Sequence, residues 1–495
     1  MDLQRKTNML KKVGVQKWTW VVLFLLLVLF FTKITPLVVF DSDDWLYVSF
    51  TRMPVPIWGH WNPSRVLPEL LMPFVSSLGA WVLYPLTGDY MGTLTLVFAV
   101  TVSLVIVVYV YAVYQLVQKK MAISSPLALG VSVLFLILHF LIFKVGDADN
   151  FYLFYADDAT CYFYYTIPTL LSLVLVAALE LHPEWRDLTN GRFRAQKALV
   201  LLAAYFLVYS NLYCSYLLTL WCALRILLKI KKPFSLRKLV GQSVFECLVI
   251  LAWFVSLVFE LSGGRAQNFS EKSITEKLAQ TIVYFTEIQY SKVFLSFAVI
   301  CIVAAGILLF QNRRQKETVD TLKLLAFMLV FLALSLAYLI LLSSVTNPDY
   351  ISRPEVLLSA YGWGLGILGI LVAYILQRCP TLRLLLPLAV FLLFFEVNCY
   401  NRGFKANDYG NVNVYAMNDI GNDMVQQFID ATDKGEECLE LHIPALEGDW
   451  PYMQDAIDDR IAHTLYKHRV IPYEIDTVVV PDDSFNAKYR IQSGE

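Results

Sequence analysis

Three carboxylates stand together in the segment Asp41-Ser42-Asp43-Asp44-Trp45, directly after the first long apolar stretch of the chain, residues 18–40. A charged side chain inside hydrocarbon costs about 2.5–3.5 kcal/mol on insertion scales, so such a cluster marks either a membrane surface or a site of chemistry. At a reaction site, a carboxylate can remove the proton of a hydroxyl group. An aspartate at the C-terminal end of an outgoing helix also opposes the helix dipole, which favours a functional interpretation of Asp43 and Asp44.

The segment 41–69 adds aromatic and basic groups to this cluster. Arg65 can bind phosphate oxygens through its planar guanidinium, or it can contact a lipid headgroup. Tryptophan and tyrosine rings suit the apolar side of a sugar, although near a membrane boundary they are more often interfacial anchors. For His60, a surface position between two tryptophans is the simpler interpretation. The candidate residues for sugar or acceptor binding in this segment are Trp45, Tyr47, Trp58, His60 and Trp61.

A second acidic loop, residues 146–161, contains four aspartates and neither lysine nor arginine. Asp157 and Asp158 are the better candidates for binding an acceptor, because they lie closer to the following apolar segment. Four such carboxylates can bind a divalent metal such as Mg or Mn through hard oxygen ligands. We prefer the alternative of a solvated rim that keeps the loop outside the membrane, and we assign no metal ligand.

The composition is that of a polytopic membrane protein. Of the 495 residues, 57% are hydrophobic and 16% are charged, whereas about a quarter of a typical soluble domain is charged. The net charge of −1 says little, because the charges are sorted by side of the membrane. The basic N-terminus followed by a long apolar stretch predicts a signal anchor rather than a cleaved signal peptide.

Basic and acidic loops alternate along the chain. The basic loops are at 119–120, 186–197, 229–238, 313–323 and 378–383, and the acidic or mixed loops are at 41–69, 146–161, 262–290 and 345–357. Because cytoplasmic loops carry the excess of lysine and arginine, this order predicts a cytoplasmic N-terminus, an extracellular C-terminus and about eleven membrane helices. The predicted spans are 18–40, 91–118, 126–145, 162–181, 198–210, 213–229, 240–261, 291–310, 323–345, 358–377 and 384–398.

Two segments do not fit this order simply. Residues 68–87 are apolar enough to cross, but a crossing there would invert every later loop. We therefore expect an interfacial or re-entrant helix pair, which Pro68, Pro73 and Pro85 favour. Residues 198–229 have basic loops at both ends, so we expect two short helices that turn at Ser210-Asn211. Asn211 in that turn either orients a substrate or, more simply, caps the second helix.

Few basic residues fall on the predicted outer side, and an anionic lipid phosphate would explain their presence there. The candidates taken from among them are Arg65, Arg265, Lys292 and Arg353. Each is as readily explained by pairing with a local acid such as Glu287 or Glu355.

The tail, residues 399–495, differs from the rest in being polar and acidic. A helical pattern at 452–468 and a strand-like run at 477–480 closed by Pro481 predict a small extracytoplasmic α/β domain after a transmembrane domain at 1–398. In the first domain, the outer loop 41–90 carries the interfacial helices. The eight cysteines form no zinc spacing, and most lie in apolar spans.

The Asp-Asp pair after the first span, with Trp61 and Arg65, a polytopic body and an outer tail, resembles the GT-C class of membrane glycosyltransferases. The matching residues are Asp43-Asp44-Trp45-Leu46-Tyr47. Within that class the chain is most similar to the bacterial branch that decorates cell-wall polymers or O-antigen, including the GtrII-type glucosyltransferases. Motifs of P-loop ATPases, dinucleotide enzymes and zinc proteases are absent from the sequence, which argues against those classes.

The resemblance implies a polyprenyl-phosphate sugar donor, a glycan or polyol-phosphate acceptor such as a teichoic acid, and inverting transfer on the outer face of the cell membrane. Asp43 or Asp44 would be the base, and Arg65, with Arg353, Arg265 and Lys292, would bind the donor phosphate. A donor synthase, a flippase and membrane lipid would be partners, and nucleic acid would not. The alternative is a transporter or flippase of lipid-linked sugars, for which Glu246 and Arg225 are charges within predicted spans.

Overall fold

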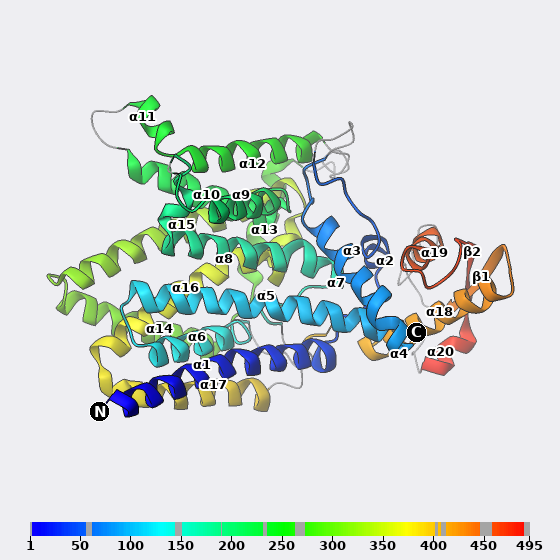
Figure 1. Cartoon of the computed structure of the whole chain (residues 1–495), viewed down its shortest axis with the longest axis horizontal. Helices are drawn as coiled ribbons and strands as arrows, with labels where there is room; N and C mark the ends of the chain where they lie inside the picture. The colour runs from blue at the N-terminus through cyan, green and yellow to red at the C-terminus, as the bar shows by residue number, and fades with distance from the viewer. Residues whose placement is uncertain are drawn as a thin grey trace.

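A bundle of long, mostly antiparallel helices forms the body of the protein (Figure 1). The computed structural model describes residues 2–55, 62–143, 151–189, 191–230, 235–262, 273–400, 404–406, 412–445 and 458–489. The bundle helices are α1 (Asp2–Leu29), α5 (Tyr90–Lys120), α6 (Ser125–Leu138), α8 (Ile167–Leu181), α9 (Arg194–Val208), α10 (Leu212–Lys229), α12 (Val244–Ser262), α14 (Lys292–Gln311), α15 (Lys316–Val345), α16 (Pro354–Arg378) and α17 (Leu386–Tyr400).

Short helices connect or extend these elements, mainly at the two ends of the bundle. The short α-helices are α2 (Ser42–Tyr47), α3 (Pro68–Leu78), α4 (Tyr84–Thr87), α7 (Ala159–Cys161), α11 (Leu236–Gly241) and α13 (Ile274–Glu287). The π- and 3-10-helical segments are η1 (Phe30–Ile34), η2 (Gly79–Leu83), η3 (Tyr162–Thr166), η4 (Pro183–Arg186), η6 (Pro348–Ser352) and η7 (Pro380–Leu385).

Nine helical runs in the described part of the chain are long and apolar enough to cross a membrane, and two further apolar helices are shorter. The nine runs are 16–34, 68–87, 90–120, 159–181, 212–229, 244–262, 292–311, 316–345 and 354–378. Each of the eleven predicted spans overlaps a helix, although α6 ends at Leu138 and α9 has 15 residues. The prediction of a helical polytopic protein is therefore confirmed at the level of helices, and the number that cross stays a prediction.

The two ends of the bundle carry different loops. The N-terminus lies at one end together with α11, which overlaps the basic 229–238 region. The tail lies at the opposite end (Figure 1). The turn at Tyr209–Asn211 separates α9 from α10, as predicted, so the loops before and after this pair return to the same end. The positions of the N-terminus and the tail at opposite ends are what an odd number of crossings requires.

The run from Pro68 to Thr87 is one continuous series of helical turns, α3, η2 and α4, rather than a separated pair. It crosses the tail-side end of the bundle at a steep angle to α5 instead of running alongside it (Figure 1). Pro73 lies inside α3, and the wider π-helical turn of η2 follows it. The steep orientation favours an interfacial helix, although the length alone would permit a crossing.

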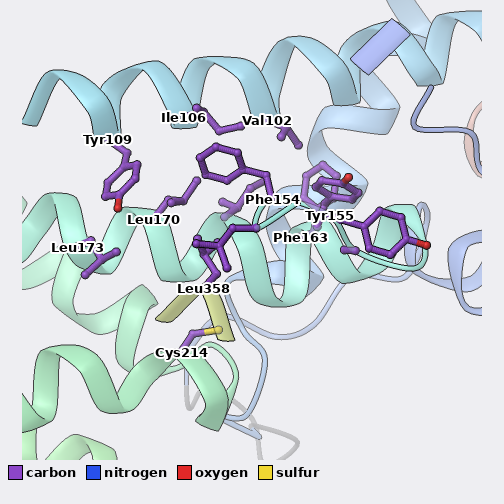
Figure 2. Close-up of a cluster of buried hydrophobic side chains, with 14 of the residues drawn as sticks. Val102, Ile106, Tyr109, Phe154, Tyr155, Phe163, Leu170, Leu173, Cys214 and Leu358 are labelled. Carbon is purple, nitrogen blue, oxygen red and sulfur yellow. The ribbon is translucent and has the colours of Figure 1, made fainter. Parts of the chain in front are cut away.

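The second outer loop enters the core of the bundle instead of forming a fully solvated rim. Phe154 is fully buried and stacks on His139 with ring centroids 4.6 Å apart. Figure 2 shows its ring among side chains of α5, η3, α8 and α16, including Val102, Ile106 and Phe163. Burial of these aromatic side chains fixes the depth of residues 151–156, and the aspartates that follow are positioned by it.

The tail contains helices α18 (Val414–Asp433), α19 (Asp458–Lys467) and α20 (Asp483–Tyr489) with strands β1 (Cys438–Pro444) and β2 (Asp476–Asp482). The two strands pair in parallel, so that Leu441 lies opposite Val479, and α19 belongs to the crossover between them. The predicted strand and the helix within 452–468 are present, whereas α18 and β1 were not predicted. The predicted boundary at 398/399 falls in the last turn of α17.

The tail packs against the end of the bundle through α18 on α5 and α19 on α2. Gly421 of α18 permits a close approach, because a Cβ there would lie 2.5 Å from Met91 Cε. Asn422 accepts a hydrogen bond from the Met91 backbone N–H and donates one to Asp89. The tail is thus in direct contact with the elements that carry the candidate site.

Candidate functional site

Helix α2, which carries the Asp-Asp pair, begins a new element after the first span. The first helical run ends at Ile34, and extended residues follow, before Asp41 caps α2. The Asp41 carboxylate accepts a hydrogen bond from the Asp43 backbone N–H at 2.8 Å. The premise that these aspartates end an outgoing helix is therefore wrong, because they stand at a helix N-terminus, where negative charge is favourable.

Asp44 joins the first outer loop to the second. Its side chain is 1% exposed, and it accepts hydrogen bonds from the Phe40 N–H at 3.1 Å and from the backbone N–H and hydroxyl of Thr160 at 2.7 and 2.6 Å. Both carboxylate oxygens are thus occupied by donors from loops that are far apart in sequence. This geometry makes Asp44 a positioning residue and removes it from consideration as an accessible base.

Asp157 and Asp158, the predicted acceptor-binding pair, point to different partners. Asp158 caps α7 through the Cys161 N–H at 2.5 Å, and Asp157, with a 51% exposed side chain, lies 3.4 Å from Arg353. Burial raises the pKa of Asp158, and the charge of Asp44 raises it further. Burial likewise raises the pKa of Asp44, so both of these neighbouring acids ionise less readily than an exposed aspartate.

Asp43 differs from these carboxylates in being accessible. Its side chain is 49% exposed, and in the described residues it has one ion pair, in which Arg460 Nη1 lies 3.9 Å from its oxygen. The same guanidinium donates to the Ser42 carbonyl at 3.0 Å. Asp43 is therefore the carboxylate of α2 that a substrate hydroxyl can reach, and the tail supplies the cation beside it.

Of the candidate aromatic residues, Trp45 is buried and does not form a sugar platform. It stacks on Tyr90 at 6.4 Å with nearly parallel rings, and its carbonyl accepts a hydrogen bond from Thr464 of the tail at 2.6 Å. Tyr47 is partly buried, and its ring lies 5.1 Å from that of Tyr164. The other candidates of this loop, Trp58, His60 and Trp61, lie outside the described residues.

Arg65 lies near Tyr47 in a largely buried position that its backbone conformation helps to define. Its φ of 64° is in the left-handed region, and its N–H donates to the Ser210 carbonyl at 2.8 Å. Burial alone would lower the pKa of Arg65, but Glu260, 3.7 Å away, and other acidic groups raise it. Asn211, in the same turn as Ser210, caps α10 by accepting from the Tyr213 N–H at 3.0 Å.

A buried pair beside Arg65 was not predicted. Glu69 is fully buried, forms a short ion pair with Arg52 and accepts a hydrogen bond from the Tyr164 hydroxyl at 2.9 Å. The sequence offered one signal, because a glutamate at the start of an apolar segment needs a cation. The partner could not be identified, since Arg52 and Glu69 are 17 positions apart and no local spacing rule connects them.

Arg353 lies in a second charged group at the same end of the bundle. Its guanidinium covers the Tyr350 ring at 4.5 Å and lies 3.9 Å from Asp349. Glu355 is 1% exposed, and its oxygens accept no hydrogen bond among the described residues, although one lies 4.0 Å from Arg353. Glu355 was expected only as a local ion partner, and its unpaired oxygens make it a candidate polar contact for a ligand.

The remaining predicted cations are not joined to these groups. Lys292 is exposed in the first turn of α14, and it joins none of the acids that pair with Arg353 in the described residues. Arg265 lies outside the described residues, as do Asp147 and Asp149 of the second loop. Within the described ranges, no three histidine, cysteine or acidic side chains form a group able to hold a metal ion.

No family model, curated protein or solved structure matches this chain. Its function must therefore be inferred from the arrangement of its own residues. The structure brings together Asp44 with Asp158, Arg353 with Asp157, and Arg65 with Tyr47.

We predict that Asp44→Asn destabilises the protein. The amide can replace one oxygen at Thr160, but its NH₂ group would then oppose the Phe40 N–H, so the hydrogen bond from Phe40 to the carboxylate is lost at a cost of about 1–3 kcal/mol. Thermal unfolding of the purified protein in detergent measures the effect. The matched control is Asp43→Asn at a half-exposed position, where we expect a change within about 0.5 kcal/mol. Equal melting temperatures for the two variants would contradict the role of Asp44.

We predict that Asp158→Asn makes stability less dependent on pH. An unfolded aspartate ionises near pH 3.9, whereas burial raises the pKa of Asp158 in the folded state. The resulting stability is fully present below the unfolded pKa and is lost as the pH rises through the folded pKa. The melting temperature of the wild type should therefore fall more steeply from pH 5 to 8 than that of Asp158→Asn, which retains a capping oxygen for Cys161. If the melting temperatures of the two proteins fall equally with pH, Asp158 is not the group that makes stability depend on pH.

Proposed function

We propose that this protein is an inverting glycosyltransferase that moves a sugar from a polyprenyl-phosphate donor to a cell-surface glycan or teichoic-acid-type acceptor. The observation that carries the proposal is the accessible carboxylate of Asp43 on α2. Its neighbours Asp41 and Asp44 both accept hydrogen bonds from the backbone. We place the reaction on the extracellular side, because the basic loops gather at the opposite end of the bundle. The N-terminus is then cytoplasmic and the tail extracellular.

In the proposed reaction, the acceptor hydroxyl lies against Asp43. The carboxylate takes the hydroxyl proton as the oxygen attacks the anomeric carbon from the face opposite the phosphate. A bond forms between the acceptor oxygen and the anomeric carbon, the bond from that carbon to the phosphate oxygen breaks, and its electron pair leaves with the lipid phosphate. Phosphate is a good leaving group, so this mechanism needs a cation rather than a second carboxylic acid, unlike a two-carboxylate hydrolase.

Two cationic positions near the outer end support binding of the leaving phosphate. Arg65 and Arg353 both lie beside acids. Their side chains are 15% and 31% exposed, so each is partly accessible. Arginine binds phosphate oxygens with two parallel hydrogen bonds, which fixes the donor as well as stabilising its charge. Glu355, buried beside Arg353, would fit a sugar hydroxyl that donates to its unpaired oxygens.

The alternative, a transporter of lipid-linked sugars, expects functional charge near the middle of the membrane. Arg225, near the C-terminal end of α10, and Glu246, in the first turn of α12, are the charges considered for that role, and each lies in an ion pair. Ion pairs of this kind are accounted for by local structure, so they give the transporter alternative no specific support.

We predict that Asp43→Asn abolishes sugar transfer while leaving the protein folded. A positioned base contributes about 10²–10⁴ in rate, so the variant should lose transfer by that factor. The measurement is release of polyprenyl phosphate with sugar transfer, using purified protein, polyprenyl-phosphate sugars and a polyol-phosphate acceptor. The control is Asp430→Asn, an exposed aspartate of α18 outside the candidate site, which should keep the wild-type rate. Transfer by Asp43→Asn at the wild-type rate would exclude Asp43 as the base.

The tail has a defined part in this proposal, because α19 lies on α2. Arg460 contacts Ser42 and Asp43, and Thr464 bonds to Ser49 at 2.8 Å as well as to the Trp45 carbonyl. His468, the next turn along, bonds through Nδ1 to the Tyr90 hydroxyl at 2.6 Å. These contacts fix the orientation of α2, so the tail positions the base rather than only binding an acceptor.

We predict that Arg460→Ala lowers kcat by about tenfold to a hundredfold, because a misplacement of about 1 Å can cost the larger factor. The KM for the donor should change little, and Arg460→Lys should restore part of the rate. Arg469→Ala is the matched control. Arg469 is also a tail arginine that contacts the bundle, but its guanidinium lies over the Trp81 ring at 5.0 Å instead of contacting α2. If both alanine variants lose the same activity, the effect comes from docking in general, and a specific role of Arg460 is excluded.

A further inference from the structure

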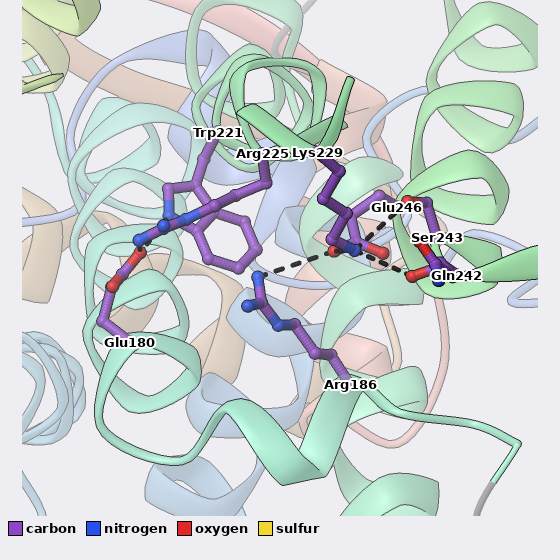
Figure 3. Close-up of polar contacts among 8 residues, drawn as sticks. All are labelled: Glu180, Arg186, Trp221, Arg225, Lys229, Gln242, Ser243 and Glu246. Carbon is purple, nitrogen blue, oxygen red and sulfur yellow. Dashed lines mark hydrogen bonds and ion pairs between the residues drawn. The ribbon is translucent and has the colours of Figure 1, made fainter. Parts of the chain in front are cut away.

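The end of the bundle opposite the tail contains a partly buried carboxylate, Glu180, and a buried one, Glu246. Each lies beside two cations, and Figure 3 shows all of these groups except Lys120. Glu180 forms a short ion pair with Arg225, lies 3.6 Å from Lys120 and accepts a hydrogen bond from Trp221 at 2.9 Å. Glu246 accepts from Lys229 at 2.8 Å and lies 3.5 Å from Arg186. The guanidinium groups of Arg186 and Arg225 both lie over the Trp221 ring, at 5.5 and 5.6 Å.

The charges of these groups do not balance. Two cations meet at each carboxylate, so each group keeps about one positive charge that no acid within it neutralises. In the group at Glu180, the Lys120 side chain is 38% exposed, and Arg225 Nε has no hydrogen-bond partner among the described residues. An anion bound here would therefore be attracted by the positive charge of Lys120 and Arg225, and Arg225 Nε could donate a hydrogen bond to it.

A cavity of about 830 Å³ lies directly against the Glu180 group. Lys120, Glu180 and Arg225 line it from α5, α8 and α10, and charged residues of α15 line the facing side. The charges on that facing side are neutralised locally, because Lys323 pairs with Asp320 at 3.7 Å and Glu317 with Arg378 at 3.1 Å. The uncompensated positive charge thus belongs to the wall formed by Lys120 and Arg225.

An apolar extension continues from this cavity between the helices. A second space of about 80 Å³ shares Lys120, Glu180 and Arg225 with the first and is otherwise lined mainly by apolar side chains of α5, α8, α15 and α16. Gly366 keeps it open, since a Cβ there would lie 3.4 Å from Met328 Cε and a larger side chain would fill the space. A charged cavity joined to an apolar slot matches a molecule with a phosphate at one end and hydrocarbon at the other.

We propose that this cavity binds the headgroup of an anionic membrane phospholipid, with the start of one acyl chain in the apolar slot. A phosphodiester carries one negative charge, which matches the excess at Lys120 and Arg225. Five helical runs of membrane length contribute residues to the cavity wall, so lipid headgroups lie close to it where these helices end. This site is independent of the proposed transfer reaction, which uses the opposite end of the bundle.

Native mass spectrometry of the purified full chain tests the proposal, with phosphatidylglycerol and phosphatidylcholine of identical acyl chains as probes. We expect the wild type to retain phosphatidylglycerol at least tenfold better than phosphatidylcholine. Lys120→Gln should reduce this preference about fivefold or more, while Glu180 keeps Arg225 and Trp221 as partners. Gly366→Leu should weaken the retention of both lipids, because it fills the apolar slot.

Arg313→Gln is the matched control, because it removes an exposed cation from the same end of the bundle but not from the cavity wall. It should retain both lipids as the wild type does. Equal retention of the two lipids, or equal losses in Lys120→Gln and Arg313→Gln, would overturn the proposal. Displacement of phosphatidylglycerol by inorganic phosphate at millimolar concentration would also overturn it, since the site would then take a soluble anion.

Discussion

The buried carboxylate of Asp44 determines how the tail-side end of the bundle is arranged. It accepts hydrogen bonds from Phe40, which precedes α2, and from Thr160, near the start of the membrane-length run 159–181. The two loops that it joins are separated by more than a hundred positions, and each also carries acids that remain accessible. If Asp44 were removed, α2 would lose its hydrogen bonds to Phe40 and Thr160.

Helix α2 has six residues and could not hold its orientation alone, because isolated helices of that length are unstable in water. It is held on one side by Asp44 and on the other by α19, through Arg460 and Thr464. Trp45 fills the space between these contacts and stacks on Tyr90 at the start of α5. The side chain of Asp43 is left accessible by this arrangement, and a fixed backbone under an accessible carboxylate is what a positioned base requires.

The membrane-length helices could be predicted from the sequence because hydrocarbon thickness sets their length and loop charge sets their order. The same reasoning located the acidic cluster, but it could not separate Asp43 from Asp44, because neighbouring positions on a short helix face different partners. Trp45 was assigned to sugar binding, since burial under the tail depends on contacts with α19 and α5 that no local pattern reveals. For the same reason, the buried pair of Glu69 and Arg52 and the position of Arg460 beside Asp43 appeared only in the structure.

The two ends of the bundle carry unbalanced charge of opposite sign, and this charge can be neutralised in different ways. At the outer end, acids outnumber the cations close to Asp44, and burial raises the pKa values of Asp44 and Asp158, so a proton can neutralise part of the charge. At the other end, the excess is positive and includes Arg186 and Arg225, whose guanidinium groups do not lose a proton in proteins. Aromatic contacts with Trp221 lower the cost of that charge but do not neutralise it. An excess of arginine next to an open cavity therefore calls for an anion from outside the chain, whereas an excess of aspartate needs only solvent protons.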